Sequence, residues 1–264
     1  MSSERFLRLE RSAGGRLASL EIHLPPVNVL RVGDLEALVG RLLEARDAGV
    51  LVLSGLPKAF SAGVDVADHA PEPQAIERML VAMRGVLGSL VGAPAVTIAA
   101  VNGVCLGGGA EIAAACDLIY VAEDARIGFP EIRLACFPPG AAVLLPCRLG
   151  DARAAEWILT GETFSGREAA RVGFATRAFP AEKLAREVER CAAELLARSP
   201  QALAAARDLL RRGRSEALAH ALPDAEEAYR KLAGSEDLAR AVREFGRSPH
   251  STVDSRQEKG DVDS

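Results

Sequence analysis

The sequence is poor in aromatic residues, and it also contains few lysines and cysteines. Among its 264 residues are 8 Phe, 2 Tyr and 1 Trp, so alanine, valine and leucine must build most of a hydrophobic core. Hydrophobic residues still make up 49% of the chain and charged residues 26%, which excludes a wholly disordered or fibrous protein. A chain of this length can bury a full core within one or two domains.

An excess of positive charge is also missing. The formal net charge is −4 at pH 7. Nucleic acids and anionic membranes both require a basic surface on the proteins that bind them. We therefore expect neither a nucleic acid nor a membrane as a partner.

Cysteine motifs, a signal peptide and long hydrophobic runs are absent from the sequence. The 5 cysteines are scattered and odd in number, and none forms a CxxC pair, so we expect reduced and mostly buried thiols and no metal site. No apolar segment follows Met1, and the longest weakly polar stretches, such as 93–101, are too short to cross a bilayer. These features predict a soluble cytoplasmic protein.

The first half of the chain alternates between strand and helix patterns. Two apolar segments around a Gly-Gly pair, 6–9 and 17–24, predict a β-hairpin. Further strands, a loop and helices are expected, in chain order, at 33–47 (helix), 50–54 (strand), 60–68 (loop), 73–91 (helix), 94–101 (strand), 107–115 (turn and helix) and 118–122 (strand). This order predicts an α/β fold with right-handed crossovers.

The second half is predicted to be mostly helical. Helices are expected over 151–159, 165–172, 181–197, 200–213, 215–232 and 235–245. Ser165 with Glu168 three residues later forms a capping-box pattern, and Trp157 lies on an amphipathic helix that should face the core. We divide the chain into an α/β core (1–197), a helical C-terminal region (198–246) and a polar, disordered tail (247–264).

One helix of the C-terminal region carries four arginines. Arg207, Arg211, Arg212 and Arg214 lie close together in the sequence. A cluster of this kind is typical of a solvated helix face, with a phosphate-binding site as the alternative. We expect the solvated face.

Three consecutive glycines, 107–109, follow a buried strand and begin a helix. Glycine lets backbone approach a ligand, and a helix N-terminus offers unpaired N–H groups to an anion or a developing oxyanion. The alternative is close packing of the helix on the strand. The nucleotide-binding patterns are not matched, because no Walker Lys-Ser/Thr follows.

A second loop and two glutamates could complete an active site. The segment FSAGVD (60–65) also follows a strand and could supply another N–H donor, as an oxyanion hole requires, although it could equally be an ordinary turn. Glu111 lies one turn into the helix after the glycines, and Glu131 lies in the apolar segment GFPEI (128–132). In an apolar pocket a carboxyl has a raised pKa and can serve as general acid or base. The alternative is that each glutamate is a surface or structural residue without a catalytic role.

These motifs in this order resemble the enoyl-CoA hydratase/isomerase, or crotonase, family. The resemblance rests on FSAGVD (60–65), AAVNGVCLGGGAEIAAACD (99–117), GFPEI (128–132), LTGETFSGREAARVG (159–173) and Ser199-Pro200, and it covers roughly residues 5–250. It implies a spiral of ββα units with a helical C-terminal trimerisation region. It also implies a homotrimer or a dimer of trimers.

The resemblance further implies acyl-CoA substrates and defined roles for individual residues. The amides of Val64 and Gly108 match the oxyanion hole, Glu111 matches the residue that activates water, and Glu131 matches the residue that protonates the α-carbon. Together they would add water syn across a conjugated double bond, with no metal and no organic cofactor besides the coenzyme A of the substrate. The substrate-binding positions of the family correspond to Ala62, Asp65, Gly107, Pro130, Gly140 and Phe245.

Several positions depart from the family pattern. A Gly-Ala-Gly-Gly stretch of the family is Gly-Ala-Ala-Val here (140–143), and the extra methyl groups should narrow or reshape the acyl pocket. A CoA-binding lysine is replaced by Ala67 and a basic residue after Phe245 by Ser248, for which Arg243 or Arg247 could compensate. His69 beside the first loop could contact the acyl group or remain a solvated residue.

Three functions therefore stay open. The leading one is an enoyl-CoA hydratase, and segments 64–71 and 137–146 resemble, more weakly, cyclohexa-1,5-diene-1-carbonyl-CoA hydratases. A Δ3-Δ2-enoyl-CoA isomerase needs only one carboxylate, so the presence of both Glu111 and Glu131 favours hydration. A non-catalytic acyl-CoA-binding protein is the third reading, and the two intact glutamates argue against it.

Overall fold

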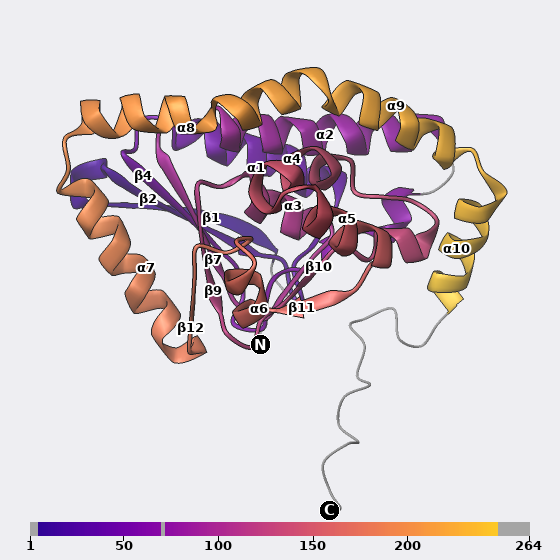
Figure 1. Cartoon of the computed structure of the whole chain (residues 1–264), viewed down its shortest axis with the longest axis horizontal. Coiled ribbons are helices and arrows are strands. Elements are labelled where there is room, and N and C mark those ends of the chain that lie inside the picture. Colours follow the sequence, from indigo (N-terminus) through magenta and orange to yellow (C-terminus); the bar gives the residue numbers. More distant parts are fainter. Residues whose placement is uncertain (1–4, 70–71, 248–264) are drawn as a thin grey trace, which may run out of the picture.

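The computed structural model describes residues 5–69 and 72–247 of the chain. It confirms the predicted α/β fold, and Figure 1 shows the strands in the middle with helices around them. The predicted tail, apart from residue 247, and the side chains of Ala67, His69 and Phe245 lie outside the described residues. Within the described ranges, none of the helices has both the length and the hydrophobicity that crossing a membrane requires.

The larger sheet has six strands in the order β1-β2-β4-β7-β9-β12. The predicted hairpin is confirmed, because β1 and β2 pair antiparallel, and each remaining neighbour pair is parallel. The strands are β1 (Phe6–Ser12), β2 (Leu17–His23), β4 (Val50–Ser54), β7 (Val96–Val101), β9 (Leu118–Ala122) and β12 (Arg177–Phe179). All six residues of β7 are buried, as a central parallel strand requires.

A second, four-stranded sheet has the order β11-β10-β8-β5, and a two-stranded sheet joins β3 and β6. These strands are β3 (Val29–Leu30), β5 (Ala59–Ser61), β6 (Gly63–Val64), β8 (Val104–Leu106), β10 (Arg126–Gly128) and β11 (Thr163–Ser165). The prediction of a plain loop over 60–68 is wrong, because that segment contributes to β5 and β6 and to the 3-10 helix η2 (Val66–His69). Strands of two or three residues leave too little periodicity to be detected in a sequence.

The chain visits the two sheets in turn and then forms a helix. β4 of the large sheet, β5 of the second sheet and the helix α2 form one such unit, and β7, β8 and α3 form the next. This repetition confirms the predicted spiral of ββα units. The helices of this part are α1 (Val32–Glu44), α2 (Pro73–Val91), α3 (Gly108–Ala115), α4 (Pro139–Leu149), α5 (Asp151–Thr160), α6 (Gly166–Arg171) and α7 (Ala181–Leu196), with the 3-10 helices η1 (Ala13–Gly15) and η3 (Pro130–Leu134).

Most of the predicted helices agree with the structure to within a few residues. Ser165 caps α6 as predicted, because its Oγ accepts a hydrogen bond from the amide of Glu168 at 3.1 Å. Trp157 is fully buried and stacks on Phe164, with ring centroids 4.5 Å apart. Helix α4 was not predicted, since the prolines at its start and at Pro146 obscure its pattern.

The C-terminal helices are α8 (Pro200–His220), α9 (Leu222–Ala233) and α10 (Glu236–Arg247). In Figure 1, α8 and α9 run along the top of the molecule beside α2, against which both pack. The predicted helix break at Gly213 is wrong, because α8 continues to His220. The next helix, α9, begins at Leu222, just before Pro223. A glycine costs a helix only about 1 kcal/mol, whereas a proline beyond the first turn costs about 3 kcal/mol.

The arginines of α8 do not form the solvated face that we expected. Arg211 is buried and Arg214 nearly so, and both donate to the carboxylate of Asp117. Arg214 also donates to the carbonyl oxygens of Ala115 and Cys116, at the end of α3. Positive groups at a helix C-terminus stabilise its dipole, so these contacts attach α8 to the buried helix α3.

The cysteines are free thiols, as predicted. Cys105, Cys116, Cys136 and Cys191 are buried, and Cys147 is exposed. Burial raises the pKa of Cys116 to about 12, so this thiol stays protonated and unreactive near neutral pH.

Candidate active site

Three loops meet at the carboxyl end of the second sheet. The parallel strands β5, β8 and β10 lie side by side there, and each ends at the same edge. The register pairs Leu106 with Gly128, and the amide of Gly107 donates to the carbonyl oxygen of Gly128 at 2.9 Å. This pairing brings the start of α3 next to η3, which carries Glu131. Ligand sites of α/β sheets commonly lie at such an edge.

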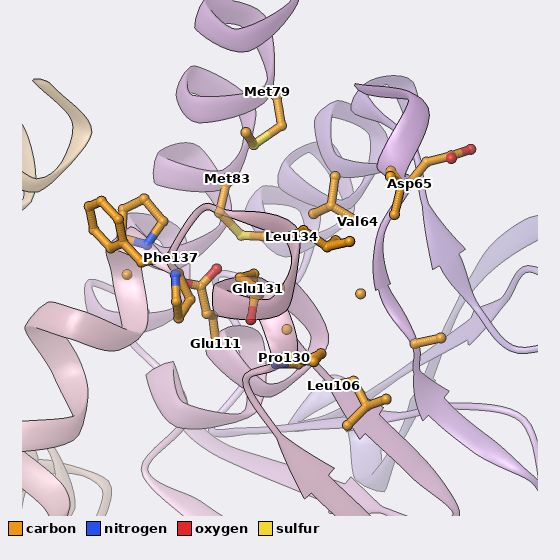
Figure 2. A pocket seen from close by; sticks show the side chains of 18 of the residues that line it. Val64, Asp65, Met79, Met83, Leu106, Glu111, Pro130, Glu131, Leu134 and Phe137 are labelled. Atoms are coloured by element: carbon orange, nitrogen blue, oxygen red, sulfur yellow. The ribbon is translucent and has the colours of Figure 1, made fainter. Parts of the chain in front are cut away.

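A cavity of about 720 Å³ opens at this edge. Figure 2 shows Glu111 and Glu131 next to each other inside it. Nine of the residues that we predicted for the site line the cavity, namely Ala62, Val64, Asp65, Gly107, Gly108, Glu111, Pro130, Glu131 and Gly140. Phe245 belongs to α10, whose residues Ala241 and Glu244 line the same cavity.

Two glycines leave space for the two carboxylates. A Cβ added to Gly107 would lie 2.5 Å from Oε1 of Glu131, and one added to Gly140 would lie 2.9 Å from Oε1 of Glu111. Gly107 also has a positive φ of +52°, which a residue with a side chain rarely adopts. Both positions therefore require glycine if the carboxylates are to keep their places.

Glu111 is a buried carboxyl with a hydrogen-bond partner. It lies in the first turn of α3, a helix without exposed residues, and is only 3% exposed. Its Oε1 accepts a hydrogen bond from the amide of Ala141 at 2.7 Å. Burial raises the pKa of Glu111 to about 7, and the amides of Ala141 and Gly140 oppose this rise because they stabilise the ionised form.

Glu131 has a less favourable environment for a negative charge. Among the described residues, no group forms a hydrogen bond with its buried Oε2 atom. Burial and the neighbouring charge of Glu111 raise the pKa of Glu131 to about 8. Only the carboxylate of Glu111 accepts a backbone amide, so the hydrogen bonds favour a negative charge on Glu111 and a proton on Glu131, which are the states of a general base and a general acid.

Two backbone amides converge on the space beside these carboxyls. The amide of Asp65 donates to the carbonyl oxygen of Leu30 at 2.9 Å, so the preceding amide, that of Val64, points away from β3. A Cβ on Gly108 would lie 3.6 Å from the Val64 nitrogen, and one on Gly63 would lie 3.6 Å from the Gly108 nitrogen. The N–H of Gly108 is also at the N-terminus of α3, where the helix dipole favours negative charge.

A buried asparagine, which the sequence analysis did not single out, holds the first loop in place. Asn28 is fully buried, and its Nδ2 donates to the carbonyl oxygens of Ala59 and Phe60 at 3.1 and 3.0 Å. Its own carbonyl oxygen accepts the hydroxyl of Ser61 at 2.7 Å, and Ser61 Oγ accepts the amide of Gly63 at 3.1 Å. These bonds fix the backbone that ends in the amide of Val64.

The rest of the cavity wall differs from expectation. Ala142 and Val143, which carry the extra methyl groups, are not among the residues that line the cavity, so the prediction that these groups narrow or reshape it is wrong. Their segment begins α4, and Ala141 and Val143 are buried against the core instead. Arg84, Arg126 and Arg133 line the cavity but were not predicted, because isolated arginines show no spacing pattern in the sequence.

Comparisons with known proteins agree with this geometry. A sequence model of the family "Enoyl-CoA hydratase/isomerase" matches residues 13–248. The chain is 33% identical over 236 residues to a protein of Bacillus subtilis named "Probable enoyl-CoA hydratase", which covers 87% of this chain and 92% of that protein. It is 35% identical over 175 residues to the cyclohexa-1,5-dienecarbonyl-CoA hydratase of Thauera aromatica. This alignment covers 65% of this chain and 66% of that enzyme.

A solved structure shows the same fold. The human mitochondrial delta3-delta2-enoyl-CoA isomerase superposes with a TM-score of 0.84 and 22% identity, over 90% of this chain and 96% of that one. At this identity the likeness concerns the fold alone. The match to the family model over most of the chain decides the classification: this chain belongs to the enoyl-CoA hydratase/isomerase family.

Proposed function

We propose that the protein is an enoyl-CoA hydratase that adds water to a conjugated enoyl- or dienoyl-CoA thioester. The observation that carries this proposal is the pair of carboxyls in one cavity, Glu111 with a pKa of about 7 and Glu131 with a pKa of about 8. Hydration requires a base for water and an acid for carbon at the same time. Relatives named as hydratases support the same reading.

The first step is the attack of water on the substrate. The thioester oxygen accepts hydrogen bonds from the amides of Val64 and Gly108. Ionised Glu111 takes a proton from water, and the water oxygen forms a bond to the β-carbon. The electrons of the double bond move to the thioester oxygen, and the two amides stabilise the resulting enolate, an effect of about 3–4 kcal/mol per donor.

The second step is proton transfer to carbon. Protonated Glu131 donates its proton to the α-carbon as the enolate returns to a thioester. The product has gained one water, Glu111 is left protonated and Glu131 ionised, and proton exchange with solvent restores the starting state. Both carboxyls act from the same cavity wall, so the two new bonds form on the same face of the double bond.

The acyl-CoA class also follows from family membership. We propose that Arg126 and Arg133 contact phosphate groups of coenzyme A in place of the family's lysine, since both line the cavity and Arg133 is exposed. The reaction needs no metal and no organic cofactor, because the amides stabilise the enolate. Aqueous chemistry of this kind is compatible with the expected cytoplasmic location.

We further propose that the protein assembles into a homotrimer or a dimer of trimers. The helix α8 carries two exposed leucines, Leu209 at 64% and Leu210 at 81% exposure. A second copy would cover such residues. Size-exclusion chromatography with light scattering checks this assembly, and the mass of a monomer would contradict it.

Hydratase activity is tested by the loss of enoyl-thioester ultraviolet absorbance. The substrates are crotonyl-CoA and, separately, cyclohexa-1,5-diene-1-carbonyl-CoA, and mass spectrometry checks for the gain of one water. We expect hydration of at least one substrate by the natural chain and a rate at least about 10²-fold lower for the Glu131→Gln variant. If a 3-enoyl-CoA keeps its mass while its double bond shifts, the protein is an isomerase and not a hydratase. Binding of the thioesters without any reaction would indicate a non-catalytic acyl-CoA-binding protein.

A further inference from the structure

Two helices form the wall of the cavity opposite the loops of the second sheet. In Figure 1, α9 runs beside α2, and the two helices pack against each other. One face of each helix lines the cavity, with Met79, Leu80, Met83, Arg84 and Leu87 from α2 and Leu222, Glu226 and Tyr229 from α9. Among these described residues, Arg84 and Glu226 alone are charged.

The two charged residues form an ion pair at the cavity. Arg84 Nε lies 3.3 Å from Glu226 Oε1. Glu226 is only 2% exposed, while the side chain of Arg84 is 44% exposed. Removing the carboxylate of Glu226 from water is costly, and a partner as exposed as Arg84 returns little of that cost. The buried carboxylate therefore calls for a reason other than the stability of the fold.

A second ion pair already links the two helices outside the cavity. Arg230 of α9 donates to Glu77 of α2 at 2.7 and 3.3 Å, and both side chains are partly exposed. Arg230 also lies 3.4 Å from Glu226. The Arg230–Glu77 pair therefore connects α9 to α2 without Arg84.

A leucine one helical turn from Arg84 lies near the reacting groups. Leu87, one helical turn after Arg84 on the same face of α2, reaches within 2.4 Å of the position that a Cβ of Gly140 would take. That same position is 2.9 Å from Oε1 of Glu111. An acyl group that extends past Glu111 along α2 therefore meets the side chains of Leu87 and then Arg84.

We propose that Arg84 and Glu226 recognise a hydroxyl group on the acyl chain, beyond the reacting double bond. This inference rests on the proposed function and names the substrate class of the same site. A hydroxyl has one donor and two acceptor positions. It can accept a hydrogen bond from the guanidinium of Arg84 and donate one to the carboxylate of Glu226 at the same time.

Other acyl groups match the pair less well. A plain alkyl chain would cover both charges without offering a hydrogen bond, which is unfavourable for buried charged groups. A carboxylate could accept from Arg84 but would be repelled by Glu226. A carbonyl could accept from Arg84 but has nothing to donate to Glu226.

The test compares trans-2-enoyl-CoA thioesters of increasing chain length, each with its ω-hydroxy counterpart. At the chain length that reaches the pair, we expect kcat/KM of the natural chain to be about tenfold higher for the hydroxylated thioester, the value of one hydrogen bond to a charged group. At the shortest chain length the two thioesters should differ little.

Two variants separate recognition from stability. We expect the Arg84→Met, Glu226→Leu double variant to fold and to lose the tenfold preference, so that the ratio of the two kcat/KM values falls to one or below. Arg230→Met is the matched control, because it removes the other arginine near Glu226 without changing the cavity lining, and it should keep the ratio.

The outcomes distinguish this inference from the proposed function. Hydration with equal kcat/KM for alkyl and ω-hydroxy thioesters at every length would overturn the inference and leave the hydratase intact. If the protein hydrates neither, calorimetry with saturated acyl-CoA and ω-hydroxyacyl-CoA measures recognition directly. About tenfold tighter binding of the hydroxylated thioester, lost in the double variant, would then support the inference, and equal binding would overturn it.

Discussion

The two walls of the cavity are built in different ways. The wall that carries Glu111 and Glu131 consists of loops at the ends of β5, β8 and β10, and much of its chemistry resides in backbone amides and glycines. The opposite wall consists of side chains of α2 and α9, which are far apart in the sequence. Under the proposed function, the loop wall offers groups for the reaction, and the helical wall offers side chains that select the acyl group.

This difference has consequences for substitution. On the loop wall, the geometry depends on the absence of side chains at Gly107 and Gly140, so even a methyl group is harmful there. On the helical wall, changes of side chain alter the shape and polarity of the cavity while the helices remain. The predictions below test this contrast, beginning with the largest expected effect.

Replacing either carboxyl of the loop wall should affect the reaction most. We expect Glu111→Gln and Glu131→Gln each to lower kcat by about 10²–10⁴-fold, because each removes one proton-transfer group. Steady-state absorbance assays measure this loss. Glu187→Gln in α7 is the control, because this residue pairs with Arg190 and does not line the cavity. A carboxyl variant as active as this control would exclude a catalytic role for the replaced residue.

Adding a single methyl group at Gly107 should cause the second-largest loss of activity. Gly107→Ala places a Cβ 2.5 Å from Oε1 of Glu131 and strains the backbone at a φ of +52°. Displacement of a catalytic group by about 1 Å can cost about 10²-fold in rate, and we expect a loss of that size in kcat. Gly40→Ala in α1 meets no atom within 4 Å and should keep full activity. Equal activity of the two variants would contradict the close approach of Gly107 to Glu131.

The attachment of the helical region to the core should affect stability rather than chemistry. Asp117→Ala leaves Arg211 and Arg214 without their buried partner, and breaking such a pair costs about 3–5 kcal/mol. Urea denaturation followed by circular dichroism measures the free energy of unfolding. Glu187→Ala removes only an exposed pair with Arg190 and should change that energy by less than about 0.5 kcal/mol. Similar losses in both variants would show that the buried cluster does not support α8.

The stability of the fold should also depend on pH. The pKa of Glu131 rises from 4.5 to about 8 on folding, so its protonated form stabilises the fold below pH 4.5, and this contribution is lost as the pH rises through about 8. Glutamine does not ionise. We therefore expect the melting temperature of Glu131→Gln to rise relative to that of the natural chain as the pH increases from about 5 to about 9. Thermal denaturation across this range measures the difference, and a constant difference would mean that Glu131 keeps its ordinary pKa in the fold.

Much of the core was predictable because its elements are long or strongly patterned. The helix over Pro73–Val91 and the strand over Leu118–Ala122 agree with the sequence periodicity residue for residue. The break placed at Gly213 failed because packing of α8 outweighs the low helix propensity of one glycine. The solvated interpretation of Arg211 failed because no local pattern shows that Asp117, which is distant in the sequence, lies beneath it.

The sequence by itself determined the α/β class, the order of the main elements and the two glutamates with their glycine loops. These features depend on neighbouring residues, through periodicity and short motifs. Tertiary structure alone decided that Glu111 and Glu131 share one cavity, that the amides of Val64 and Gly108 converge, and that Arg84 meets Glu226. Those contacts join residues from separate elements, and they exist only because the register of the strands and the packing of the helices bring the elements together.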